Sequence, residues 1–210
     1  MEFLHTPELR SWRRFFFVSI LLLVVVPSFA ASDDNAFLEM IQRRTFTYFI
    51  ECTNPENGLV MDKADNFRPC PLDSSFASVS GVGFGLAVMV VGAERGWISK
   101  AEAEKITLVT LRYFWNRMPH EHGFFYHFVD IRTGQRFEKV ELSSIDTALF
   151  IAGCLLSAEY FVNPEIKLLA SRLYNRVDWN WMTNGTQFLC MGWSPEEGFQ
   201  KYYWDHFSEG

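Results

Sequence analysis

The sequence predicts an all-α fold, an α/α toroid in which paired helices are joined by long loops that carry small β-hairpins. Apolar residues recur at helical spacing in five segments of the chain, which is the pattern of amphipathic helices. Loops rich in aromatic residues separate these segments, and strand-like alternation is brief. Long loops in a compact domain are usually functional. We therefore expect a site where the loops converge.

The composition narrows the class of protein further. The chain has 210 residues, of which 49% are hydrophobic, and a net charge of -6. That apolar content excludes an intrinsically disordered chain. The absence of a basic excess argues against a nucleic-acid partner, because phosphates are bound through Lys and Arg. An acidic protein suits a neutral or cationic partner better than an anionic one.

The N-terminus has the pattern of a secretory signal peptide. Three arginines precede an apolar run over residues 15–26, and Pro27 and a small-residue segment follow, which are the three regions of such a signal. A transmembrane anchor is the alternative, but the run is shorter than the ~20 residues that span a bilayer. We expect residues 1–30 to be removed, residues 31–210 to form the domain, and the mature protein to be periplasmic or secreted. Contact with a membrane would occur only through this segment before cleavage.

The first three predicted helices cover residues 34–51, 76–95 and 99–118. Asp33 or Asp34 caps the first helix. The second contains Gly81, Gly83 and Gly85, which lower helix propensity but permit close backbone packing. Ser99 and Glu102 form a capping box at the start of the third helix.

The second part of the chain begins with a predicted β-hairpin, in which residues 124–130 pair with residues 135–140 around a turn at residues 132–134. Ser143 or Ser144 caps a helix that ends near residues 160–161, and Asn163 and Pro164 start another that runs to about residue 177. Residues 178–203 read as loop and hairpin. Residues 205–210 resemble the start of a further helix.

The four cysteines do not have the spacing of a zinc site. Cys52 and Cys70 flank one polar loop and could pair, since export permits disulfides. Cys154 lies in an apolar helical run and is expected to be a buried thiol. We expect neither a metal nor a cofactor.

Two acidic clusters are candidates for chemistry. Glu141 precedes a predicted helix and Asp146 lies in its first turn, where free backbone N–H groups stabilise a negative charge. Helix capping alone would also explain an acid there, but Asp146 borders an apolar run and hence the core. The second cluster lies in residues 202–209, where Asp205 or Ser208 could cap the last helix and Glu209 would fall in its first turn.

Aromatic and polar residues that could bind a sugar surround both clusters. Tyr and Trp offer flat apolar faces with polar edges, which suit sugar rings, although core packing is the commoner role of any single aromatic. His127 lies near the predicted hairpin with His120 and His122, at a spacing that matches no standard metal motif. The expected substrate-binding residues are Trp193, Tyr202, Tyr203, Trp204, Asp205, Tyr126 and His127.

Two carboxylates facing each other across a groove fit glycoside hydrolysis. One protonates the leaving oxygen, while the other activates water or attacks the sugar. The expected partner is accordingly an oligo- or polysaccharide.

A series of short motifs, in order along almost the whole mature chain, resembles the glucoamylase-like proteins related to glycoside hydrolase family 144. Each motif is weak alone, and their order is specific. They are Asn57–Val60, Val82–Leu86, Glu94–Ile98, Gly123–Phe128, Glu141–Leu149, Arg176–Trp179, Gly192–Glu196 and Trp204–Glu209.

This resemblance implies an (α/α)6 barrel and activity on β-1,2-linked glucans in an exported enzyme. The family's acids map onto Asp146 and Glu209, with Glu141 an extra acid shared by the glucoamylase-like branch. The endo-glucanase branch carries another carboxylate three residues before the position of Asp146, where this chain has Ser143. Gly210 also replaces the alanine usual after the glutamate.

The length of the chain indicates how much of the expected barrel it contains. At about 30 residues per helix with its loop, the chain holds roughly half of a twelve-helix barrel. We therefore expect a glucoamylase-like domain truncated at its C-terminus, with apolar surface exposed and poor solubility. Two other functions remain open: a non-catalytic glycan-binding protein or inactive remnant, and a different helical-barrel carbohydrate enzyme, such as a lyase that uses Tyr and His.

Overall fold

A computed structural model describes residues 34–65 and 67–206, and these fall into two units that divide between Thr45 and Phe46. Residues 34–51 are helical, as the capping pattern predicts. The predicted signal peptide and Glu209 lie outside the described residues, so both stay predictions. No helix among the described residues is long and apolar enough to cross a membrane.

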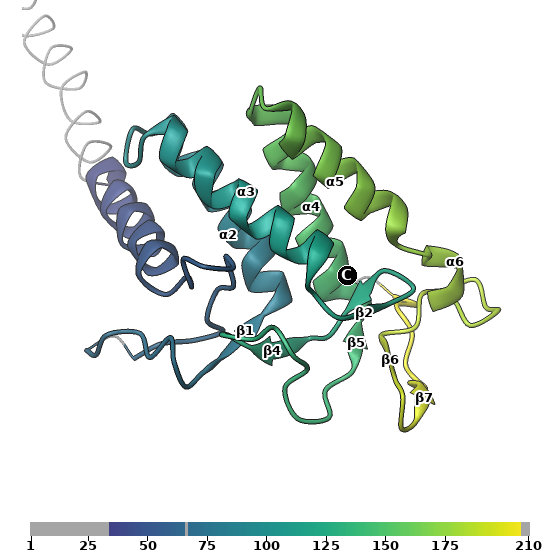
Figure 1. Ribbon diagram of the computed structural model, residues 1–210. Helices are drawn as coiled ribbons and strands as arrows, with labels where there is room; N and C mark the ends of the chain where they lie inside the picture. Colours follow the sequence, from purple (N-terminus) through teal and green to yellow (C-terminus); the bar gives the residue numbers. More distant parts are fainter. Residues whose placement is uncertain (1–33, 66, 207–210) are drawn as a thin grey trace, which may run out of the picture. The chain divides into compact units, whose positions relative to one another are not determined.

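Helices dominate the second unit. The long ones are α2 (Val79–Glu94), α3 (Lys100–Asn116), α4 (Ser144–Tyr160) and α5 (Pro164–Arg176), and α6 (Trp179–Met182) is a single turn. Helices α2 and α4 pack against each other, and α3 and α5 form a second layer in front of them (Figure 1). This pairing agrees with the predicted helical class.

The strands are short and gather at one end of the helices, below them in Figure 1. They are β1 (Phe76–Ser78), β2 (His120–Glu121), β3 (Phe124–Phe125), β4 (Phe128–Asp130), β5 (Leu142–Ser143), β6 (Gly192–Ser194) and β7 (Gly198–Phe199). In the part of the chain that the structure describes, they form three antiparallel sheets with strand orders β1-β4, β2-β3 and β5-β6-β7. Two of these strands, β1 and β5, lead directly into the N-termini of α2 and α4.

The predicted helix boundaries are largely confirmed, because capping side chains define them. Ser99 and Ser143 each accept a hydrogen bond from a backbone N–H of the first turn, in α3 and α4 respectively. Asn163 does the same at α5, where Pro164 occupies the first position.

Two predictions about local structure are wrong at the strands. Phe76–Ser78 is strand β1 rather than the first turn of a helix, and it pairs with β4. The predicted hairpin between residues 124–130 and 135–140 is reduced to a turn and one bridge, Val129 to Arg136. Strand β4 forms its regular ladder with the distant β1 instead, and Val129 lies between Ala77 of β1 and Arg136 of the bridge.

Glycines set the close packing of α2 on α4. A Cβ on Gly83 would overlap backbone atoms of Leu149, and one on Gly153 would overlap the carbonyl of Gly83. The stacked rings of Phe114 and Phe150 fill the adjacent core, with centroids 3.9 Å apart. The glycine pattern in the second helix is thus used for packing, as predicted.

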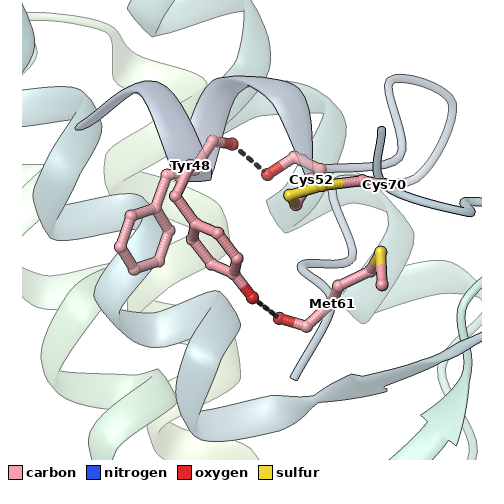
Figure 2. Close-up of a disulfide and its surroundings, with 6 residues drawn as sticks. Tyr48, Cys52, Met61 and Cys70 are labelled. Carbon is pink, nitrogen blue, oxygen red and sulfur yellow. Dashed lines mark hydrogen bonds between the residues drawn. A yellow bond between two sulfur atoms is a disulfide. The ribbon is translucent and has the colours of Figure 1, made fainter. Parts of the chain in front are cut away.

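The loop after the first helix is tied down covalently. Cys52 and Cys70 form a disulfide, which realises the pairing that the sequence left open (Figure 2). Beside it, the Tyr48 hydroxyl donates a hydrogen bond of 2.6 Å to the carbonyl of Met61. Cys154 is a buried free thiol, as expected, and burial raises its pKa well above the usual range.

Candidate active site

Asp146 is a buried carboxylate at the N-terminus of α4, with only 4% of the residue exposed. The Ser143 hydroxyl donates to its Oδ2 at 2.5 Å, and its own backbone N–H donates back to the Ser143 oxygen at 3.2 Å. The α2 N-terminus also reaches it, because the backbone N–H of Ser80 donates to Oδ1 at 3.3 Å. The carboxylate therefore lies at the positive ends of two helix dipoles, which stabilise its negative charge.

His127 connects Asp146 with Glu141. Its Nδ1 lies 3.1 Å from Glu141 Oε1, and its Nε2 lies 3.8 Å from Asp146 Oδ2. The backbone fixes the ring in the same place, since the His127 N–H donates to the Glu141 carbonyl and the His127 carbonyl accepts from the N–H of Val79. Both flanking carboxylates favour the doubly protonated ring.

The charges of this cluster reinforce each other. Burial disfavours the charged form of His127, but the hydrogen bond to Glu141 and the nearby carboxylates outweigh it, so the pKa of His127 is raised. The hydrogen bond from His127 in turn lowers the pKa of Glu141, against the effect of burial. The two shifts therefore favour a charged pair, an imidazolium hydrogen-bonded to an ionised Glu141.

A groove of about 570 Å³ begins at Glu141 and runs along the β6–β7 hairpin. It is lined by carboxylates, amines and two aromatic rings, a mixture that can hydrogen-bond hydroxyl groups and also cover an apolar face. The lining residues are Lys139, Glu141, Ser194, Glu196, Glu197, Gly198, Phe199, Gln200, Lys201 and Tyr202.

One of the predicted binding residues lines this groove, and two others pair with Leu142 of β5, the residue after the lining residue Glu141. Tyr202 lines it and is 70% exposed. Trp193 lies in β6, opposite Leu142 of β5, which places it one residue from Glu141 in the neighbouring strand. Tyr126 forms a bridge with the same Leu142. Strand β5 is thus the element that brings the predicted residues together.

The remaining predicted residues lie elsewhere around the hairpin. The indole N–H of Trp204 donates to the Ser144 hydroxyl at 2.9 Å, so this side chain braces the start of α4. Tyr203 pairs with Cys190, and Asp205 forms an exposed contact with His206. The structure brings Asp146, Glu141 and His127 together.

The three histidines near the predicted hairpin do not cluster. His122 stacks on Trp181 with ring centroids 4.3 Å apart, and His120 packs edge-on against Phe125. Across residues 34–65 and 67–206, no group of three or more His, Cys, Asp or Glu side chains is arranged to hold a metal ion.

Local sequence patterns do not reveal the contacts that Ser80, Arg136 and Glu196 make in the site. Ser80 contributes a backbone N–H to Asp146 from a different helix. Arg136 forms a bidentate pair with Glu196 on the groove wall. These contacts join residues about 60 positions apart, which local patterns do not reveal.

The fold and the site together define a helical protein with a histidine-bridged carboxylate pair beside an aromatic groove. Comparison with known proteins identifies relatives of this chain. A search against models of protein families finds no match. One relative is an exo β-1,2-glucooligosaccharide sophorohydrolase (non-reducing end) of Parabacteroides distasonis, 25% identical over 178 residues, which cover 79% of this chain and 24% of the relative.

The solved structures that match this chain include proteins of the same kinds. An endo-β-1,2-glucanase from Chitinophaga pinensis, in complex with sophorotriose and glucose, matches with a TM-score of 0.69 and 25% identity over 78% of this chain and 41% of that chain. A glucoamylase-like protein from Bacteroides fragilis matches with a TM-score of 0.67 and 29% identity over 79% of this chain and 42% of that chain. The homologues of this chain are therefore glucoamylase-like and β-1,2-glucanase proteins, which confirms the resemblance that the motifs imply. The chain spans about a quarter to two fifths of their lengths.

Proposed function

We propose that the protein is an exported glycoside hydrolase that cleaves a β-glucan, with β-1,2-glucan as its substrate. The observation that carries this proposal is the pair Glu141 and Asp146, bridged by His127 at the end of an aromatic groove. Relatives named for β-1,2-glucan hydrolysis support the choice of linkage.

The proposed chemistry assigns Asp146 as the base. Its carboxylate takes a proton from a water molecule as the oxygen of that water bonds to the anomeric carbon. The glycosidic C–O bond breaks at the same carbon, and the leaving oxygen takes a proton from Glu209, the remaining predicted acid. Glu141 is a poor proton donor, because its hydrogen bond with His127 lowers its pKa. We assign Glu141 and His127 to binding and orienting the sugar.

The same proposal covers architecture and location. Helices α2 to α5 are two of the helical hairpins of an (α/α)6 barrel in residues 31–210, with the groove at the end where the strands gather. Residues 1–30 direct export to the periplasm or the medium. The disulfide between Cys52 and Cys70 supports an oxidising compartment.

A second candidate function is binding of a glycan without hydrolysis. One observation favours it: among the described residues, His127 engages both acids of the site and lowers the pKa of Glu141, which makes this acid a poor proton donor. Under this alternative the groove would hold the sugar, and no bond would break.

Product analysis with a panel of glucans separates the two functions. The purified chain is incubated with linear β-1,2-, β-1,3- and β-1,4-glucans, and reducing ends are measured. The proposed hydrolase releases reducing ends from the β-1,2-glucan and little from the others. Binding of β-1,2-glucan, measured by calorimetry, without any release of reducing ends would establish the second function. The absence of both binding and release would refute both functions. Absorbance of products in the ultraviolet would instead indicate a lyase.

A further inference from the structure

We infer that Arg136 is a positioning residue of the site, which holds Glu141 and the β6–β7 wall of the groove in a fixed relation. The inference rests on the proposed function, since it gives the groove a sugar to hold. Arg136 lies on the loop between β4 and β5. Its side chain contacts three separate parts of the site.

The first two contacts are hydrogen bonds, one to a backbone carbonyl and one to a carboxylate. The Arg136 Nε donates to the carbonyl of Val140, the residue immediately before Glu141, at 2.6 Å. Its two terminal nitrogens donate to the two carboxylate oxygens of Glu196 at 2.7 and 2.9 Å. One guanidinium therefore links the backbone beside the acid to the turn between β6 and β7. A planar fork is required for this geometry, and Lys cannot supply it.

The third contact orients the guanidinium itself. Its carbon lies 4.9 Å from the centroid of the Tyr126 ring, a cation–π arrangement. Only 15% of the Arg136 side chain is exposed, against 44% for its partner Glu196. Arg136 is thus held in place from the protein side and presents its planar fork to the more exposed carboxylate of Glu196.

Close packing makes the position of Glu141 sensitive to this link. Gly192 at the start of β6 lies so near that a Cβ there would be 2.6 Å from Glu141 Cγ. The side chain of Glu141 is therefore seated against the backbone of β6. A shift of β6 and β7 relative to residues 140–142 would move the carboxylate away from His127.

A second bidentate pair in the same molecule provides a control. Arg112 donates to both oxygens of Glu165 at 2.6 Å, between α3 and α5 and outside the groove lining. The side chains of Arg112 and Glu165 are 52% and 43% exposed, respectively. This pair is also a bidentate arginine–glutamate pair, but it lies away from the groove and its arginine is more exposed.

Amide hydrogen exchange tests the inference without assuming any activity. Two reporters are the amide of His127, which donates to the Glu141 carbonyl, and the amide of Gln200, which donates to the Gly192 carbonyl. In Arg136→Ala we expect both to exchange about tenfold faster after correction for global stability, because the local opening free energy falls. Arg136→Lys gives an intermediate change. Arg112→Ala leaves both reporters at the wild-type rate.

Titration with sophorotriose tests the consequence for the groove. Arg136→Ala and Glu196→Ala each weaken binding by about tenfold, and the double variant is no weaker than either alone, because one link is lost in all three. Arg112→Ala binds as the wild type does. Wild-type protein that does not bind sophorotriose would refute the proposed function, while the exchange experiment would still decide the role of Arg136. Unchanged exchange at both reporters in Arg136→Ala, or an equal acceleration in Arg112→Ala, would overturn the inference.

Discussion

Helices α3 and α4 start with the same local sequence pattern, but their N-termini lie in different environments. Each has a serine cap with an acid three residues later, Ser99 and Glu102 in α3 and Ser143 and Asp146 in α4. The side chain of Glu102 is half exposed and lies 3.5 Å from the Lys105 amine. The side chain of Asp146 is 6% exposed and faces His127.

This difference shows that the cap is a local property and the site a tertiary one. Each serine satisfies a backbone N–H of its own helix, whatever surrounds it. Only α4 has the N-terminus of a second helix and an imidazole ring against its acid, because α2 crosses it closely and β5 leads into it. The four predictions below test this contrast, from the largest expected effect to the smallest.

The largest effect is expected from neutralising the two first-turn acids. Asp146→Asn should lower the rate of β-1,2-glucan hydrolysis by about 10²- to 10⁴-fold, because a general base is lost. Glu102→Gln should leave the rate unchanged. Both variants keep their serine caps, so circular dichroism should show folded proteins. Equal rates for the two variants would mean that Asp146 is only a capping residue.

The second prediction concerns the stability contributed by the close crossing of α2 and α4. Gly83→Ala should destabilise the protein by about 3 kcal/mol, because the new methyl group overlaps the backbone near Leu149. Gly81→Ala in the same helix is the control. Its methyl group would lie 3.4 Å from Ser78 Cβ, an ordinary contact, and the gain in helix propensity is up to ~1 kcal/mol.

Chemical denaturation measures both glycine variants. A free energy of unfolding for Gly83→Ala equal to that of Gly81→Ala would contradict the role of the crossing in holding Ser80 against Asp146.

The two serine caps should differ in their contribution to stability. Ser99→Ala removes one capping hydrogen bond and should cost about 1 kcal/mol. Ser143→Ala also removes the donor to a buried carboxylate and should cost about 2 to 3 kcal/mol. Urea unfolding of the two variants under identical conditions makes the comparison, and equal losses would show that the environment of α4 adds nothing to the cap.

The smallest expected effect is a shift in the titration of His127. Its folded-state pKa is raised, so its contribution to stability is full below the ordinary value of 6.5 and is lost as the pH rises through the folded value. The pKa of Glu141 is lowered, so its contribution is full above 4.5 and is lost as the pH falls through the folded value. The pair therefore stabilises the protein most between pH 4.5 and 6.5.

NMR titration of the imidazole resonances checks this assignment. In Glu141→Gln the pKa of His127 should fall relative to wild type, since the hydrogen-bonded negative charge is gone and burial remains. Glu102→Gln should not change it. A pKa of His127 that is the same in wild type and Glu141→Gln would contradict the observed ion pair.

Local patterns in the sequence predicted most of the helices and part of the site. Serine caps, the proline at the start of α5 and the glycines of α2 act on neighbouring residues, so they can be read from the chain itself. Asp146 could be identified because a first-turn acid was followed by an apolar run. The pairing of Phe76 with Asp130 and the link from Arg136 to Glu196 could not, since they depend on how distant segments pack.

The central claim is that the groove beside Glu141 and Asp146 binds a β-1,2-linked glucan. The most direct measurement is a ¹H–¹⁵N NMR titration of the purified chain with sophorotriose. We predict saturable shifts at the indole N–H of Trp193 and at the backbone amides of Glu141, Gln200 and Tyr202, and no shift at Glu102. An absence of shifts, or shifts confined to residues away from the groove, would contradict the account.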